Sequence, residues 1–298
     1  MSFVDYVTKQ QKKTENIQLL IYRWLSAFIL LVVLLKINAF DMHCSYQYTW
    51  DGYCCISVDT EIRLNKDGLR NLVGIHAKNR DNSDVTCLSF HYSNVEYFSN
   101  NFYKKFTNLK SLVVYFSDLK SLERFMFSGA NKLEKLMVNN NCLKTIKGNT
   151  FADATGLHTI DLKLNIIELI DAFAFSGLNK LTILDLSFNM IKSIHRNTFI
   201  ELQSIQKLSL SYNQLTSINK DMFKYNYGLV EIYLGGNKIK TVAIPNPFSH
   251  LKYLRVLYFE SNLCIDLKFS DMLGIHDSKL SDAIKKCQYN DILIKTSN

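Results

Sequence analysis

The chain has 298 residues, and its 19 Phe and 16 Tyr are too many for a disordered, solvated polymer. With only 11 Gly and 2 Pro, collagen-like and low-complexity structures are excluded as well. The formal net charge is +8, but the first 39 residues contribute +3, so the rest of the chain carries about +5. That excess is too small to favour a nucleic-acid partner.

Residues 1–39 contain a hydrophobic targeting segment. Trp24 to Leu35 are twelve consecutive apolar or small residues with a cation on each side. A bilayer span takes about 20 such residues, so the run predicts a signal peptide that is cleaved after Ala39. If Leu19–Tyr22 is included and one arginine is tolerated, the same segment is an uncleaved signal anchor. Both alternatives place the remaining chain outside the cell.

Residues 40–84 form the predicted N-terminal cap, which holds Cys44, Cys54 and Cys55. All seven cysteines of the chain lie after the leader. This distribution is typical of an oxidising compartment, in which disulfides persist.

A repeat of 24 residues extends over residues 85–267. Its pattern is L-x-x-L-x-L-x-x-N-x-L-x-x-L, with an aromatic residue five positions beyond the last leucine. The eight units begin at Val85, Leu109, Leu133, Leu157, Leu181, Ile205, Leu229 and Leu254. The Asn position holds Ser93 and Ser117 in the first two units, and then Asn141, Asn165, Asn189, Asn213, Asn237 and Asn262.

This pattern resembles the leucine-rich repeat, and its 24-residue spacing resembles the extracellular "typical" class with a Phe in each unit. The resemblance implies an α/β solenoid, a horseshoe with a parallel concave sheet, about eight repeats and disulfide-capped ends. We expect each Asn to turn inward and to satisfy backbone groups at the tight bend. A column of phenylalanines should stack behind the strands, at Phe127, Phe151, Phe175, Phe199, Phe223 and Phe248.

The ends of a solenoid need covers, and residues 268–298 form the predicted C-terminal cap and tail. Six cysteines are placed to close the caps, namely Cys44, Cys54, Cys55, Cys87, Cys264 and Cys287. We expect two bridges in the N-terminal cap and a third between Cys264 and Cys287. Adjacent Cys54 and Cys55 rarely pair with each other, and which of them joins Cys44 stays open.

Cys142 is the odd cysteine that this assignment leaves over. It is either a partly buried thiol or the site of a covalent dimer, through a disulfide to a second chain.

Catalytic and metal-binding motifs are missing from the sequence. The seven histidines form no H-E-x-x-H, and neither G-x-S-x-G nor G-x-G-x-x-G occurs. Cys54-Cys55 lacks the spacing of zinc ligands. The sequence therefore predicts no enzyme, no cofactor and no metal site.

Strand alternation predicts the surface for a protein partner, because the residues between the repeat leucines face the concave side. The candidate residues are Tyr115, Met137, Asp161, Lys163, Asp185, Tyr233, Tyr258 and Glu260. Tyr233 and Tyr258 are neighbours there, and tyrosine is enriched at binding hot spots. Asp161 and Asp185 should lie about 5 Å apart, where they either bind a basic group or are ordinary repeat residues.

A basic ridge is predicted just after the Asn-x-Leu step of several units, at Lys144, Lys192 and Lys240, with Lys120 at the matching place one unit earlier. The ridge is either a solvated flank or a site that attracts sulfated glycans or acidic membranes.

The chain as a whole resembles insect secreted leucine-rich proteins, including the leucine-rich immune family, whose members act by binding other proteins. The resemblance implies a secreted protein-binding module that acts in recognition or adhesion, with an innate immune role. The alternatives are an extracellular-matrix protein that binds anionic glycans and a signal-anchored cell-surface protein.

Overall fold

The computed structural model describes residues 42–57, 72–73, 75–93, 95, 98, 100–270 and 280–287, within the unit that begins at Asp41. The predicted leader, residues 1–39, lies outside the described residues, as do residues 288–298 of the tail. Among the described residues, no helix is long and apolar enough to cross a bilayer.

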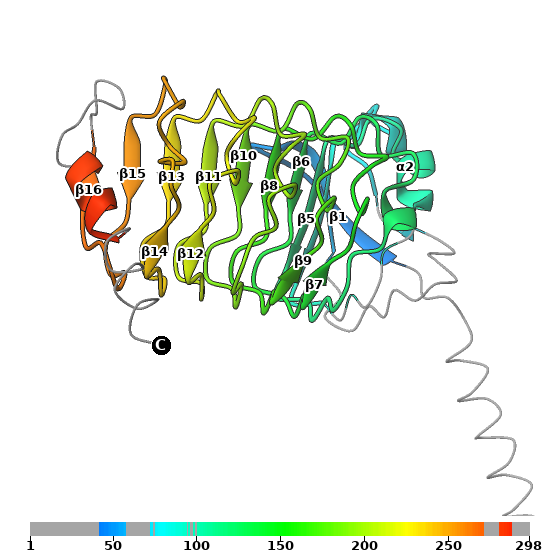
Figure 1. The fold of residues 1–298 in the computed structure, drawn as a ribbon. Helices are drawn as coiled ribbons and strands as arrows, with labels where there is room; N and C mark the ends of the chain where they lie inside the picture. Colours follow the sequence, from blue (N-terminus) through cyan, green and yellow to red (C-terminus); the bar gives the residue numbers. More distant parts are fainter. Residues whose placement is uncertain are drawn as a thin grey trace, which may run out of the picture. The chain divides into compact units, whose positions relative to one another are not determined.

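Parallel strands at the repeat spacing form one side of the solenoid and lie side by side in sequence order (Figure 1). Eight such strands are separated by about seven turns, which confirms the predicted solenoid with a parallel sheet. They are β4 (Cys87–His91), β5 (Ser111–Tyr115), β6 (Lys135–Met137), β8 (Thr159–Asp161), β10 (Ile183–Asp185), β11 (Lys207–Ser209), β13 (Glu231–Tyr233) and β15 (Val256–Tyr258).

Shorter elements lie on the other side of several coils. Two-residue strands pair in parallel there, β7 (Thr145–Ile146) with β9 (Leu169–Ile170) and β12 (Ser217–Ile218) with β14 (Thr241–Val242). The helical segments near the N-terminal end are η1 (Asn82–Asp84), α2 (Asn101–Lys105) and η2 (Arg124–Phe127).

Stacking of coils buries the apolar residues that no single coil could bury by itself. The second residue of each of these eight strands is in register with its neighbours and at most 1% exposed, from Leu88 to Leu257. The predicted phenylalanine column is present, with all six rings at most 1% exposed. Ring centroids of neighbours such as Phe127 and Phe151 or Phe151 and Phe175 lie 5.2 and 5.9 Å apart. Phe98 extends the column at its start.

The asparagines form a buried hydrogen-bonded ladder along the solenoid. Asn189 donates from Nδ2 to the carbonyls of Leu162, Leu186 and Ser187 at 3.0–3.1 Å. Its Oδ1 accepts the backbone N–H of Ile167, at 2.9 Å, from the preceding coil. The asparagines thus turn inward and bond backbone groups, as the sequence predicted, and the structure adds that these bonds join adjacent coils. In the Asn place of the second unit, Ser117 makes only one such bond to a carbonyl, to Tyr115 at 2.7 Å.

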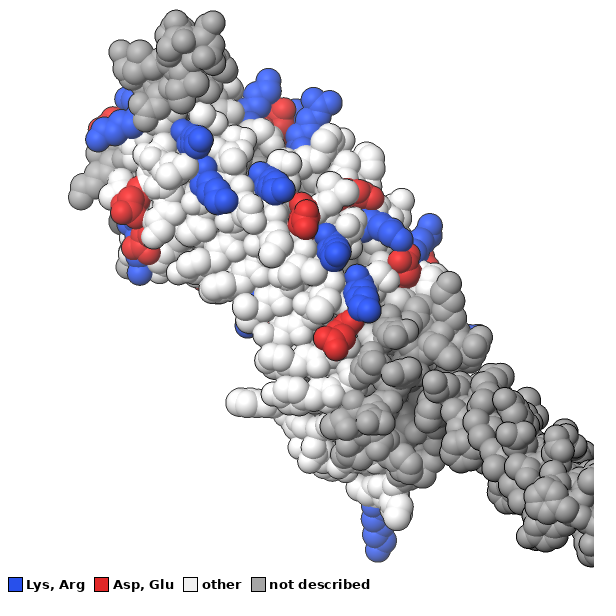
Figure 2. Space-filling view, turned by 90° about the horizontal axis from the view of Figure 1, so that it is seen from below, with Lys and Arg blue, Asp and Glu red and all other residues white. Residues whose placement is uncertain are grey.

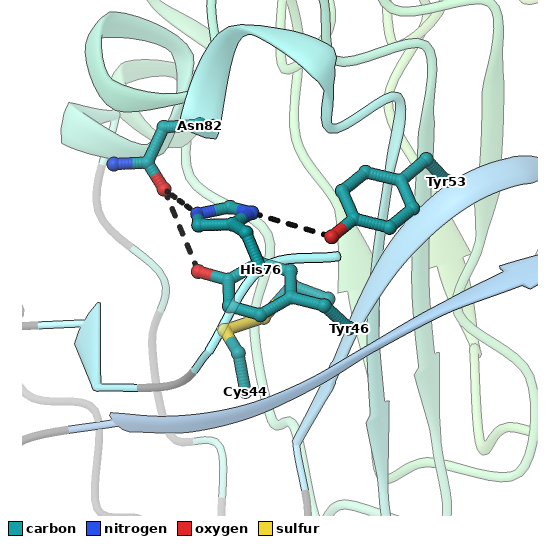
Figure 3. Close-up of a disulfide and its surroundings, with 6 residues drawn as sticks. Cys44, Tyr46, Tyr53, His76 and Asn82 are labelled. Atoms are coloured by element: carbon teal, nitrogen blue, oxygen red, sulfur yellow. Dashed lines mark hydrogen bonds between the residues drawn. A yellow bond between two sulfur atoms is a disulfide. The ribbon is translucent and has the colours of Figure 1, made fainter. Parts of the chain in front are cut away.

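An antiparallel hairpin of β1 (Met42–Thr49) and β2 (Gly52–Ser57) covers the N-terminal end, and β2 pairs in parallel with β4. The two-residue strand β3 (Leu72–Val73) pairs with the outer side of β1. A disulfide between Cys44 and Cys55 lies beside a cluster of aromatic rings (Figure 3). In that cluster the ring of His76 stacks on the ring of Tyr46, with the centroids 3.8 Å apart. Nδ1 of His76 lies 3.4 Å from the hydroxyl of Tyr53.

The second bridge that the sequence predicts in the N-terminal cap is not present: Cys54 and Cys87 are free, buried thiols. They lie directly opposite each other on the parallel strands β2 and β4. Neighbouring strands lie about 4.8 Å apart, which is within the Cα range of disulfides, and here the two thiols form a hydrogen bond and no covalent bond. A hydrogen bond between the two thiols lowers the pKa of Cys54, and the same bond and burial raise the pKa of Cys87.

The C-terminal end is closed by β16 (Lys268–Phe269), which pairs antiparallel with β15. A helix over residues 280–287 follows, and Leu280, Ala283 and Ile284 are its buried apolar residues. The predicted disulfide between Cys264 and Cys287 is present. Both ends of the sheet therefore finish in an antiparallel strand and a disulfide.

Candidate binding surface

The parallel register aligns the predicted partner-binding residues in rows across the sheet. One row contains five of them, and each is paired with its neighbour on the adjacent strand: Met137, Asp161, Asp185, Tyr233 and Tyr258. Ser209 of β11 lies in the row between Asp185 and Tyr233. Because successive residues of a strand face opposite sides, these side chains share the face opposite the buried leucines. The structure thus brings these five of the eight predicted residues together on one face.

Exposure differs along this face. Tyr115, Met137, Lys163, Asp185, Tyr233 and Tyr258 are half-buried, and Glu260 is exposed. Asp161 is only 7% exposed, so it offers less to a partner than its sequence position suggests.

Both candidate acidic residues are satisfied within the chain. Asp161 accepts hydrogen bonds from the side chain of Asn139 at 3.1 Å and from the backbone of Lys163 at 3.0 Å. Asp185 accepts from the backbone and hydroxyl of Ser187 at 2.9 and 2.6 Å. Burial raises the pKa of Asp161, although the hydrogen bonds that its carboxylate accepts act to lower it. No group of three His, Cys, Asp or Glu that could hold a metal ion occurs in the part of the chain that the structure describes.

Tyr233 and Tyr258 form a stacked pair, with centroids 4.9 Å apart and planes at 11°. The ammonium of Lys207 lies 5.0 Å from the centroid of Tyr233, and that of Lys268 lies 4.5 Å from the centroid of Tyr258. Cations over aromatic faces are attracted by the ring quadrupole, so each lysine helps to hold its ring.

Glu231 contacts both Tyr233 and Lys207 of this cluster. Its carboxylate accepts the hydroxyl of Tyr233 at 2.9 Å and forms an ion pair with Lys207 at 2.9 Å. The hydrogen bond with Lys207 lowers the pKa of Glu231 and raises that of the lysine. Burial and then the bond to Glu231 raise the pKa of Tyr233. The stacked tyrosines are therefore ordered before any partner binds.

Sequence reasoning missed the lysines of this cluster. Lys207 lies two residues before Ser209 on β11, so strand alternation could have placed it on the same face. Lys268 follows the last repeat, and only the antiparallel return of β16 brings it beside Tyr258.

The N-terminal end of the face holds a second polar and aromatic group. His91 contacts Tyr115 edge to face at 5.4 Å, and Tyr115 donates its hydroxyl to the sulfur of Met137 at 3.2 Å. Burial raises the pKa of Tyr115 to about 12 and lowers that of His91. Asp51, in the hairpin turn, forms an ion pair with Lys135 of β6 at 2.5 Å. The cap hairpin thereby reaches across β4 and β5 and bounds the candidate surface.

The four lysines of the predicted basic ridge, Lys120, Lys144, Lys192 and Lys240, are all exposed. Within the described ranges, none of them makes an ion pair. On the face that Figure 2 presents, however, positive and negative side chains are interspersed beside a broad area without charge. Cys142 is a free, partly exposed thiol whose Sγ lies 3.9 Å from the carboxylate of Asp118.

Comparisons with known proteins agree with this architecture. No curated protein sequence matches the chain significantly. Among solved structures, the Toll-like receptor TLR13 in a complex with single-stranded RNA aligns with a TM-score of 0.53 and 20% identity. That alignment covers 69% of this chain but only 37% of the receptor chain, and at this identity it shows a similar fold alone.

The family model for the leucine-rich repeat matches residues 107–165, 155–215 and 203–264. These overlapping matches cover more than half of the 298 residues, and domains of this kind typically bind proteins and are not enzymes. The 24-residue coils, the parallel sheet and the asparagine ladder are the structural counterpart of that match. The chain belongs to the leucine-rich repeat family.

Proposed function

We propose that this chain is an extracellular binding module that recognises a protein partner on the concave face of its sheet, in recognition or adhesion. The ordered Tyr233–Tyr258 pair is the observation that carries this proposal. Tyrosines supply a large contact area at low conformational-entropy cost, and here Lys207, Lys268 and Glu231 already limit their motion. The face is an open row of eight strands, and this row is long enough for a standard protein interface.

Two features of the chain support an extracellular location. Disulfides close both ends of the solenoid, and such bonds persist in oxidising compartments. The leader predicts export, by cleavage after residue 39 or by anchoring. The resemblance to insect secreted leucine-rich proteins adds an innate immune role to the proposal.

The test replaces both tyrosines, Tyr233→Ala with Tyr258→Ala, in the full chain. Proteins retained from extracellular fluid by the immobilised wild type are identified, and the affinity of each purified candidate is then measured by calorimetry. We expect the double variant to lose at least tenfold in affinity, about 1.4 kcal/mol. A matched control replaces Tyr227 and Tyr253, which are 57% and 67% exposed outside the concave face.

The control variant should bind as the wild type does. Equal affinity of the wild type and the Tyr233/Tyr258 variant, with the fold intact by circular dichroism, would remove the concave tyrosines from the binding site.

A second candidate function is binding of sulfated glycans by the basic ridge. It is favoured by the exposure of Lys120, Lys144, Lys192 and Lys240 and by their lack of ion pairs within the described part of the chain. Binding to a heparin column should then weaken steeply as ionic strength rises, because exposed charges are screened within about 8–10 Å at physiological salt. Binding of a protein by the tyrosine pair should depend much less on salt.

A further inference from the structure

One residue of each coil lies directly before the ladder Asn or Ser, and we call these residues the turn row. In chain order the row is Tyr92, Phe116, Asn140, Leu164, Phe188, Tyr212, Gly236 and Ser261. Every member has a left-handed backbone, with φ between 49° and 68°. Five of the first six are large and apolar, and these five are 42–66% exposed.

The fold itself does not need apolar side chains at these positions. Left-handed backbone suits Gly and Asn, and it is strained for bulky residues. Asn140, Gly236 and Ser261 show that small or polar residues complete the same turn. The apolar members therefore combine backbone strain with exposure of large hydrophobic surface. A contact outside the chain would explain both.

The first six residues of the row, Tyr92 to Tyr212, read nearly the same in both directions. Tyr92 stacks on Phe116, with centroids 5.1 Å apart and planes at 10°. Phe188 stacks on Tyr212, with centroids 4.4 Å apart and planes at 13°. Between these stacked pairs lie two coils, which carry Asn140 and Leu164. A surface that reads Tyr, Phe, two coils, Phe, Tyr is self-complementary, as a two-fold contact between identical chains requires.

We propose that two copies of this chain associate through the turn row, about a two-fold axis that passes between the coils of Asn140 and Leu164. The two solenoids then run antiparallel. Phe116 of one copy faces Phe188 of the other, and Tyr92 faces Tyr212. Both stacked pairs become covered, and Asn140 faces Leu164.

Charged residues beside the turn row agree with this axis near its centre. Four positions after Asn140 lies Lys144, and four after Leu164 lies Glu168; both are exposed. The two-fold axis sets Lys144 of each copy opposite Glu168 of the other, which gives two ion pairs. Farther out it sets Lys120 opposite Lys192, a repulsion that the carboxylate of exposed Asp118 partly offsets. These charges favour the antiparallel arrangement at its centre and weaken it at its rim.

The contact is small. Six coils at about 4.8 Å and a width of four to five residues give an area of roughly 300–400 Å² on each copy. A standard stable interface buries about 800 Å² on each partner. We therefore expect a weak, reversible dimer that depends on protein concentration, and the contact leaves the concave tyrosines free for another partner.

Sedimentation velocity of the full chain over a concentration series tests this proposal. The variant carries Phe116→Asn and Phe188→Asn, because Asn140 shows that asparagine fits the backbone of this row. We expect the dissociation constant of the dimer to rise at least tenfold, with an unchanged circular dichroism spectrum. The matched control carries Phe125→Asn and Phe173→Asn, at phenylalanines that are 42% and 49% exposed outside the turn row, and it should dimerise as the wild type does.

A charge exchange tests the direction of the two chains. Lys144→Glu alone and Glu168→Lys alone should each weaken the dimer, and the two together should restore it. A chain that is monomeric at every concentration overturns the proposal, and so does a dimer that the Phe116/Phe188 variant leaves intact. Because none of these variants touches Tyr233 or Tyr258, failure here does not affect the proposed concave binding site.

Discussion

Replacement of Asn189 by alanine measures how much one rung of the ladder stabilises the solenoid. Three of its four partners are carbonyls that keep another donor: Leu162 accepts from Asn165, Leu186 from Asn213, and Ser187 from a backbone N–H. The buried N–H of Ile167 has no other acceptor among the described residues. One orphaned buried donor costs about 1–3 kcal/mol, and the loss of three shared bonds adds a smaller amount. We expect the free energy of unfolding to fall by about 3 kcal/mol, measured by urea titration followed by circular dichroism.

Two further variants separate burial from hydrogen bonding in that experiment. Asn262→Ala removes a partly exposed rung, where water can replace the bonds, and should cost only about 1 kcal/mol. Asn189→Asp keeps an acceptor for Ile167 but turns a negative oxygen toward three carbonyls. Its folded-state pKa should therefore lie above the unfolded value of about 3.9, so the destabilisation is full at pH 7 and shrinks as pH falls. A loss for Asn189→Ala no greater than that for Asn262→Ala would refute this account of the ladder.

Three other expectations follow from burial and bonding. Asp161→Asn should stabilise the fold at pH 7 by about 1 kcal/mol, because it removes a buried carboxylate whose pKa is raised by burial. The gain should vanish in acid, where the carboxyl is protonated, and thermal melts at both pH values check it. Phe175→Ala should cost about 3–5 kcal/mol in urea titrations, because its ring is 1% exposed and stacks on both sides; a cost near zero would mean that the column does not support the stack. Alkylation followed by mass spectrometry should modify Cys142 alone in the native protein and three thiols after unfolding; one thiol in both states would show that Cys54 and Cys87 are bonded.

Features that recur in every coil could be predicted from the sequence, and features that occur once could not. The Asn and Phe positions are set by a local turn and by stacking on identical neighbours, so the spacing alone places them. The Tyr233–Tyr258 contact follows from the same register. The approach of Lys268 depends on the return of β16, which no repeat encodes. The free thiols of Cys54 and Cys87 lie on β2 and β4 of the cap, and cysteine spacing carries no information about which strands the cap brings together.

The ladder also sets the step by which such a chain can change its length in evolution. Each rung bonds its own turn and the coil 24 residues earlier, with nearly the same partners at Asn165, Asn189 and Asn213. Duplication or deletion of one whole coil would return every asparagine to an equivalent set of carbonyls, whereas a change of a few residues within the turn would break several bonds at once. The inner coils are thus interchangeable parts, and each duplication would lengthen the concave face by one strand spacing, about 4.8 Å. The end hairpin and β16, which run antiparallel, are fixed pieces that duplication cannot extend.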